Sequence, residues 1–146
     1  MSSASPQSPI LHIEDDEDAI FLTRRVFEKA GIAHAFDVVR DGKAAVDYLE
    51  ERLREGGAPL PPLILIDLDL PRKDGFAVLE WISRQPALND VMAVVLSSSL
   101  EPESVNRAFA LGAAGYLAKY PSPAEVSALY AAAVSPDKWR KVAAPA

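Results

Sequence analysis

The sequence lacks cysteine, a long apolar run and an excess of basic residues, and each absence excludes a class of protein. Without cysteine, disulfide bonds and metal sites built from thiolates are excluded. No apolar run approaches the roughly 20 residues that a membrane-spanning helix needs. The 15 Lys and Arg and 21 Asp and Glu residues give a formal net charge of −6. Because no basic stripe is available to neutralise phosphates, we expect neither a nucleic-acid nor a membrane partner.

The length and composition are those of a single globular domain. The chain has 146 residues, of which 49% are hydrophobic and 25% are charged. Residues 1–8 are rich in Ser and Pro and have no apolar core, so they resemble neither a signal peptide nor an anchor. We expect a disordered tail over 1–8, one domain over 9–134, a C-terminal extension over 135–146, and a cytoplasmic location.

Segments typical of strands alternate with segments typical of helices. The expected strands are 9–13, 35–39, 63–66, 91–96 and 115–118, and a helical segment follows each one. The last helix begins at a capping box formed by Ser122 and Glu125, with Pro123 at its first position. Repeated strand–helix units predict an α/β protein, with a doubly wound parallel sheet covered by helices on both faces.

Asp67 follows a run of four large apolar residues, 63–66. Such a run predicts a strand buried on both faces, and Pro71 prevents it from continuing, while Asp74-Gly75 indicates a turn. Asp67 therefore lies at the carboxyl end of a central strand, where open α/β sheets bind ligands. An ionised carboxylate there needs a cation or hydrogen bonds.

Polar residues also end the other strands, except the second, and the topology brings them to one edge of the sheet: Glu14 and Asp15, Ser97, and Lys119. Three carboxylates about 5 Å apart repel by roughly 3 kcal/mol per pair at an effective dielectric near 20. A hard cation relieves this repulsion, and carboxylate oxygens with open water positions suit Mg²⁺. Lys119 and the Ser97 hydroxyl could then hold the oxygens of a phosphoryl group, which Asp67 would accept as an acyl phosphate.

Four motifs resemble the receiver domain of two-component response regulators: 13–16 (IEDD), 65–75 (LIDLDLPRKDG), 94–99 (VVLSSS) and 115–119 (GYLAK). The resemblance implies a flavodoxin-like (βα)5 fold with strand order 2-1-3-4-5. It implies a phosphoryl acceptor that dephosphorylates itself slowly, and not an enzyme. The roles that it implies are Glu14 and Asp15 as the acidic metal-binding pair, Asp67 as the acceptor of phosphate from a histidine kinase, Asp69 as a metal ligand through its backbone carbonyl, Ser97 as the switch hydroxyl, Tyr116 as the rotating aromatic, and Lys119 as the phosphate contact.

A long second helix, a Pro-rich insertion over 58–62 and the absence of an output domain narrow the resemblance. They are similar to the small stand-alone regulators that pair with bacterial phytochromes, which implies a bacteriophytochrome histidine kinase as partner. Regulators of that subgroup often dimerise through the tail after the fifth helix. Here Trp139 and Val142 in that tail could pack against a second copy.

The sequence departs from the family pattern at three positions. Asp69 stands where an amide is more usual, which predicts slow phosphoryl hydrolysis or altered metal affinity if its side chain points inward. Tyr120 separates Lys119 from Pro121, so we expect that any cis bond lies at Tyr120–Pro121 and none directly after the lysine. Ser97 lacks the methyl group of the commoner threonine.

Alternatives remain for the function and for single residues. Asp67-Leu68-Asp69 also resembles the nucleophile motif of haloacid-dehalogenase-type phosphohydrolases, although there the motif lies on the first strand. A pseudo-receiver that binds a partner without phosphorylation is the other alternative. Residues 14–18 alone could be an acidic helix start. His12 and His34 are interpreted as structural residues and not as phosphorelay histidines.

Overall fold

Five strands form one parallel sheet in the order β2-β1-β3-β4-β5, as predicted. The computed structural model describes residues 8–55, 59–69 and 74–135. The strands are β1 (Ile10–Ile13), β2 (Phe36–Val39), β3 (Leu63–Asp67), β4 (Met92–Ser97) and β5 (Gly115–Ala118). Because β1 and β4 pair with the two sides of β3, that strand is central and Asp67 ends it.

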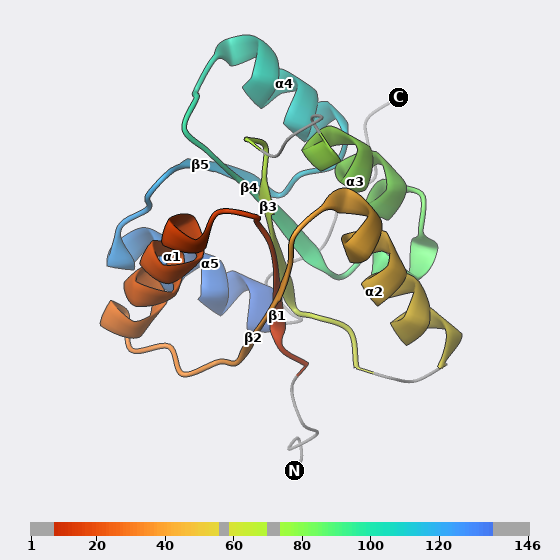
Figure 1. The fold of residues 1–146 in the computed structure, drawn as a ribbon, viewed down its shortest axis with the longest axis horizontal. Coiled ribbons are helices and arrows are strands. Elements are labelled where there is room, and N and C mark those ends of the chain that lie inside the picture. Colours follow the sequence, from red (N-terminus) through yellow and green to blue (C-terminus); the bar gives the residue numbers. More distant parts are fainter. Residues whose placement is uncertain (1–7, 56–58, 70–73, 136–146) are drawn as a thin grey trace.

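Helices cover both faces of the sheet (Figure 1). They are α1 (Glu17–Lys29), α2 (Gly42–Arg54), α3 (Asp74–Ser83), α4 (Pro102–Ala110) and α5 (Pro123–Val134), with a short 3-10 turn, η2 (Pro86–Leu88), before β4. Residues of α1 and α5 pack on one face, and residues of α2, α3 and α4 pack on the other. The predicted doubly wound architecture is therefore confirmed.

The core consists of two apolar clusters, one on each face. Alternate residues of β3 belong to different clusters, with Ile64 and Ile66 on the α2–α3–α4 side and Leu63 and Leu65 on the α1–α5 side. All four are buried, as expected for a central parallel strand. This double burial fixes the direction of β3 and so the place where Asp67 emerges.

The helix starts follow the capping signals with one correction. The predicted capping box at Ser122 and Glu125 is present. The interpretation of Asp74-Gly75 as a turn was wrong, because α3 begins at Asp74. Close packing favours Gly75 there: a Cβ atom on it would lie 2.7 Å from Leu68 Cδ2 and 3.0 Å from the carbonyl oxygen of Asp67.

Residues 1–7 and 136–146, at the two ends of the chain, lie outside the described residues. The predicted tail, the extension and the dimer contact at Trp139 therefore stay predictions. None of the helices in the described residues is long and apolar enough to cross a membrane.

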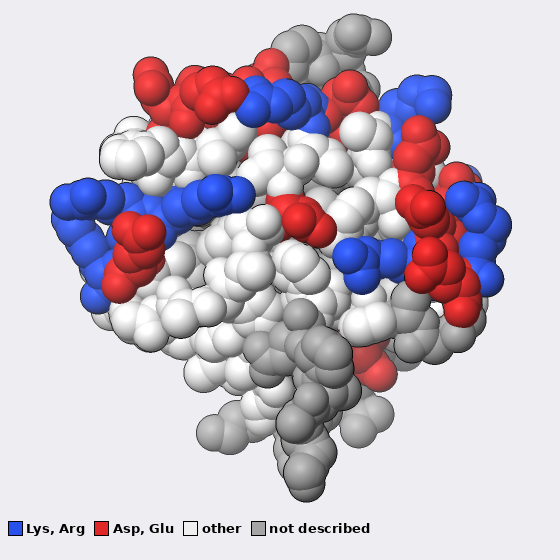
Figure 2. All heavy atoms as spheres, turned by 60° about the horizontal axis from the view of Figure 1, so that its bottom comes forward, with Lys and Arg blue, Asp and Glu red and all other residues white. Residues whose placement is uncertain are grey.

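Figure 2 shows the face of the molecule that lies at the bottom of Figure 1. Acidic and basic side chains lie close together around the margin of this face, and the area between them is mainly uncharged.

Candidate phosphoryl-acceptor site

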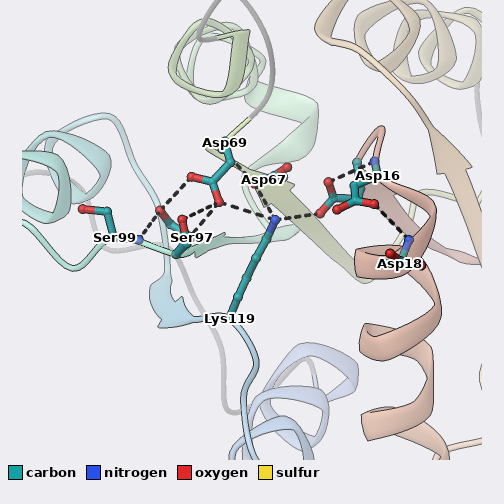
Figure 3. Close-up of polar contacts among 9 residues, drawn as sticks. Asp16, Asp18, Asp67, Asp69, Ser97, Ser99 and Lys119 are labelled. Atoms are coloured by element: carbon teal, nitrogen blue, oxygen red, sulfur yellow. Dashed lines mark hydrogen bonds and ion pairs between the residues drawn. The ribbon is translucent and has the colours of Figure 1, made fainter.

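The ends of four strands bring the predicted site residues together at one edge of the sheet. Glu14 and Asp15 follow β1, Asp67 ends β3, Ser97 ends β4, and Lys119 follows β5. The parallel register of these strands places all of these ends on the same side. In Figure 3 the side chain of Lys119 extends toward Asp67 and Asp69, with Ser97 on one side and Asp16 on the other.

Three carboxylates form a cluster that suits a small, hard cation. Glu14, Asp15 and Asp67 each offer an oxygen, and these oxygens lie within 4.8 Å of one another. Glu14 and Asp67 are each 1% exposed, whereas Asp15 is exposed. Two buried carboxylates and one facing solvent would supply oxygen ligands and leave room for water, so the donor set fits Mg²⁺ or a similar divalent ion.

Lys119 lies between the carboxylates and compensates part of their charge. Its Nζ atom is 3.1 Å from Glu14 Oε1, 3.0 Å from Asp67 Oδ1 and 3.5 Å from Asp69 Oδ2, and its side chain is 10% exposed. Burial alone would lower the pKa of this ammonium group, but the hydrogen bonds and charges of Asp67 and Glu14 outweigh burial and raise it. Lys119 therefore stays protonated across the physiological range.

The pKa of the Glu14 carboxyl group is raised by its surroundings. Burial, followed by the neighbouring Asp67, raises the pKa of Glu14 to about 8, even though Lys119 acts in the opposite direction. In the absence of a metal ion, Glu14 therefore holds a proton more tightly than an ordinary glutamate does. A divalent cation would compete with that proton, because metal ligands must be deprotonated.

Asp69 points its side chain into the site. Its backbone N–H donates to Asp67 Oδ1 at 2.8 Å, and its carboxylate accepts hydrogen bonds from Ser98 N at 3.1 Å, Ser98 Oγ at 3.0 Å and Ser97 Oγ at 3.4 Å. The sequence marked Ser98 only as part of a serine run, and its two contacts with Asp69 were not predicted.

Ser97 and Tyr116 are linked through the loop that follows β4. Ser97 Oγ, on a residue that is 2% exposed, accepts a hydrogen bond from Ser99 N at 3.1 Å. The Tyr116 hydroxyl donates to the Ser99 carbonyl oxygen at 2.7 Å. The predicted switch residues are thus two hydrogen bonds apart, and their switching role stays a prediction.

The peptide bond after Lys119 corrects one expectation. The bond between Lys119 and Tyr120 is cis, and no cis bond is present at Tyr120–Pro121. The expectation rested on the strong association of cis bonds with proline, which is a preference and not a prohibition.

Neither histidine forms a hydrogen bond with the carboxylate cluster among the described residues. His12 is fully buried, and both of its ring nitrogens lack a hydrogen-bond partner. Burial, with smaller contributions from Lys119 and Arg24, lowers the pKa of His12 to about 3, so the ring is neutral. His34 bonds to the Tyr130 hydroxyl at 2.8 Å and to the carbonyl oxygen of Ser8 at 2.7 Å, as a structural residue would.

Comparison with known proteins identifies the family. Residues 10–131 match the response regulator receiver domain. The chain is 41% identical to the probable methanogenesis regulatory protein FilR2 of Methanothrix harundinacea over 75% of this chain and 70% of that one. It is 35% identical to the response regulator Rcp1 of Synechocystis over 80% and 79%.

Solved structures agree with this assignment. The bacteriophytochrome response regulator RtBRR is 31% identical, covers 96% of this chain and 84% of its own, and superposes with a TM-score of 0.74. The Mn²⁺-bound form of Rcp1 is also 31% identical, with coverage of 94% and 98% and a TM-score of 0.69. The resemblance to regulators associated with bacterial phytochromes is thereby confirmed, and the chain belongs to the response regulator receiver domain family.

Proposed function

We propose that this receiver domain accepts a phosphoryl group from a sensor histidine kinase on Asp67, with Mg²⁺ bound, and that phosphorylation changes its interactions with partner proteins. The observation that carries the proposal is the meeting of a buried Asp67, two further carboxylates and one buried ammonium group at a single edge of the sheet. Phosphoryl transfer needs chiefly positioning and charge stabilisation, and these groups supply both.

The contacts of Asp67 leave one carboxylate oxygen for the reaction. Lys119 Nζ and Asp69 N both bind Oδ1, so Oδ2 is the oxygen that neither of these two cationic or N–H donors engages. Attack by Oδ2 on a phosphohistidine forms the O–P bond as the P–N bond breaks, and the electron pair stays on the imidazole of the kinase. We propose that Lys119 and the Ser97 hydroxyl hold the transferred oxygens.

Glu14, Asp15 and Asp67 are the residues that would hold the metal ion, with the Asp69 backbone carbonyl as the further ligand that the family resemblance implies. When bound, Mg²⁺ would neutralise the carboxylates and stabilise negative charge on the phosphoryl oxygens. Without it, Lys119 is in contact with the side chains of Glu14, Asp67 and Asp69, which leaves little of its positive charge for an incoming phosphoryl group.

The partner and the regulation follow from the similarity to bacteriophytochrome regulators. We infer a bacteriophytochrome-type histidine kinase as phosphoryl donor, slow self-dephosphorylation without turnover of a substrate, and a cytoplasmic location. Phosphorylation would shift the loop after β4, with Ser97 and Tyr116 moving together. The dimer contact through residues 135–146 is part of the same proposal.

Radiolabelled acetyl phosphate with Mg²⁺ and an acid quench tests the acceptor role. We expect a lasting label on the wild type and on Asp90→Asn, which removes an exposed charge far from the site, and no label on Asp67→Asn. Rapid phosphate release without lasting label would indicate a phosphohydrolase, and no label on the wild type would indicate a pseudo-receiver. An equal label on Asp67→Asn would overturn the assignment of the acceptor.

The kinase class is tested separately with labelled phosphohistidine on a purified sensor kinase. We expect transfer from a bacteriophytochrome-type kinase to be faster than transfer from a kinase of another sensor class. Equal rates would remove the argument for a phytochrome partner and leave the acceptor assignment intact.

A further inference from the structure

The Asp69 carboxylate is bound by the groups that the proposed function assigns to a phosphoryl group. Lys119 Nζ lies 3.5 Å from Asp69 Oδ2, and the Ser97 hydroxyl donates to Asp69 Oδ1 at 3.4 Å. The backbone N–H and the hydroxyl of Ser98 donate to Asp69 Oδ2 at 3.1 and 3.0 Å. Figure 3 shows the Asp69 carboxylate between Ser97 and Lys119, next to Asp67.

We propose that, in the unmodified protein, the Asp69 carboxylate is an internal occupant of the phosphoryl-binding site, where it is bound by Lys119, Ser97 and Ser98. It holds the loop 97–99 and Tyr116 in place, and it is displaced when Asp67 receives a phosphoryl group. The inference rests on the proposed function, because it concerns the same groups.

The geometry makes the Asp69 carboxylate and a phosphoryl group on Asp67 compete for the same donors. Asp69 N donates to Asp67 Oδ1 at 2.8 Å, and Lys119 bridges the carboxylates of both residues, so the two side chains share one small site. A phosphoryl group on Asp67 would bring further negative charge and oxygens that need the same donors. The added negative charge of the phosphoryl group would repel the Asp69 carboxylate, and the two groups would compete for Lys119 and the serine donors.

Exposure indicates which group leaves. The side chain of Asp69 is 36% exposed, whereas those of Lys119 and Asp67 are 10% and 1% exposed. Asp69 can therefore rotate into solvent and be hydrated there, while the donors stay where they are. Displacement therefore requires only that the side chain of Asp69 moves.

A chain of hydrogen bonds extends the effect of the occupant to β5. Asp69 accepts from Ser97 Oγ, Ser97 Oγ accepts from Ser99 N at 3.1 Å, and the Ser99 carbonyl oxygen accepts from the Tyr116 hydroxyl at 2.7 Å. The Asp69 carboxylate thus fixes the loop 97–99, in which the Ser99 carbonyl oxygen accepts the hydrogen bond from Tyr116. In its absence the donors of Ser97 and Ser98 lose their acceptor, and the loop is held less firmly.

Binding of the phosphoryl analogue beryllofluoride with Mg²⁺ tests the displacement. We expect Asp69→Ala to bind it about tenfold more tightly than the wild type, because no internal occupant has to leave first. Asp69→Asn, which keeps the shape but not the charge, should lie between the two. Asp90→Asn removes the same charge from an exposed position and should match the wild type. Thermal unfolding of each variant confirms that it is folded.

NMR of tyrosine-labelled protein tests the link to Tyr116. Without the analogue, the Tyr116 signal should be sharp in the wild type and broadened or shifted in Asp69→Ala, and beryllofluoride should restore it in the variant. If Asp69 only supported the loop, Asp69→Ala would bind the analogue more weakly. Unchanged or weaker binding, or an unchanged Tyr116 signal, would overturn the inference while the proposed function stands. Failure of the wild type itself to bind the analogue would overturn both.

Discussion

The buried Glu14 makes the metal-free protein less stable as the pH rises, and Glu14→Gln should remove that dependence. Burial and the neighbouring Asp67 raise the pKa of Glu14 from 4.5 to about 8. The folded state therefore binds this proton more tightly than the unfolded state. The stabilisation that results is complete below about pH 4.5 and is lost as the pH rises to about 8.

The size of the effect follows from the linkage relation. Each pH unit between the two pKa values changes the free energy of unfolding by about 1.4 kcal/mol, so the interval from pH 4.5 to 7 corresponds to up to about 3 kcal/mol. For a chain of this length, that is roughly 9 °C in melting temperature. Relative to the wild type, Glu14→Gln should therefore gain up to about 3 kcal/mol between pH 5 and pH 8.

Urea unfolding followed by circular dichroism, in EDTA and at several pH values, measures this difference. Asp90→Asn is the control for the loss of one charge and should run parallel to the wild type. Mg²⁺ at pH 8 should stabilise the wild type, because it binds only the folded state, and should stabilise Glu14→Gln much less. Parallel pH profiles of Glu14→Gln and the wild type, or equal stabilisation of both by Mg²⁺, would refute the reasoning.

Three further predictions concern the scaffold. The pKa of His12 is lowered to about 3, so its contribution to stability is present above about pH 6.5 and is lost as the pH falls. Below pH 6.5, the free energy of unfolding of the wild type should fall with pH more steeply than that of His12→Leu, by up to about 1.4 kcal/mol per pH unit. Urea unfolding measures both slopes, and parallel slopes would contradict this prediction. Gly75→Ala introduces a Cβ atom 2.7 Å from Leu68 Cδ2. It should therefore lower the free energy of unfolding by about 1–3 kcal/mol and slow the labelling of Asp67. A variant with the stability and the labelling rate of the wild type would argue against the close packing. Ser122→Ala removes the cap of α5 and should cost about 1 kcal/mol in the same assay, while Ser122→Asp, which can still cap, should cost much less; equal losses would mean that the cap is not the cause.

The fold could be predicted from the sequence because its signals are local. The apolar run 63–66 indicates a buried strand, and the Ser122–Glu125 capping box marks the start of a helix. Parallel strands then leave little choice about which loops meet. The grouping of Glu14, Asp15 and Asp67 follows from that topology and required no knowledge of side-chain contacts.

The details that the sequence did not predict depend on packing between distant segments. Gly75 reads as a turn signal when it is considered locally, and only the approach of Leu68 shows why a helix begins with glycine there. The contacts between Ser98 and Asp69 join two loops 29 residues apart in the sequence. The direction of the Asp69 side chain follows from those donors, and no pattern in the sequence specifies it.

A crystal structure of the protein with Mg²⁺ and beryllofluoride tests the central claim most directly. We expect the metal ion on Glu14, Asp15 and Asp67, the beryllofluoride on an oxygen of Asp67 with Lys119 and Ser97 in contact, and the Asp69 side chain turned toward solvent. A metal ion elsewhere, or an Asp67 carboxylate without the analogue at saturating concentration, would contradict the account.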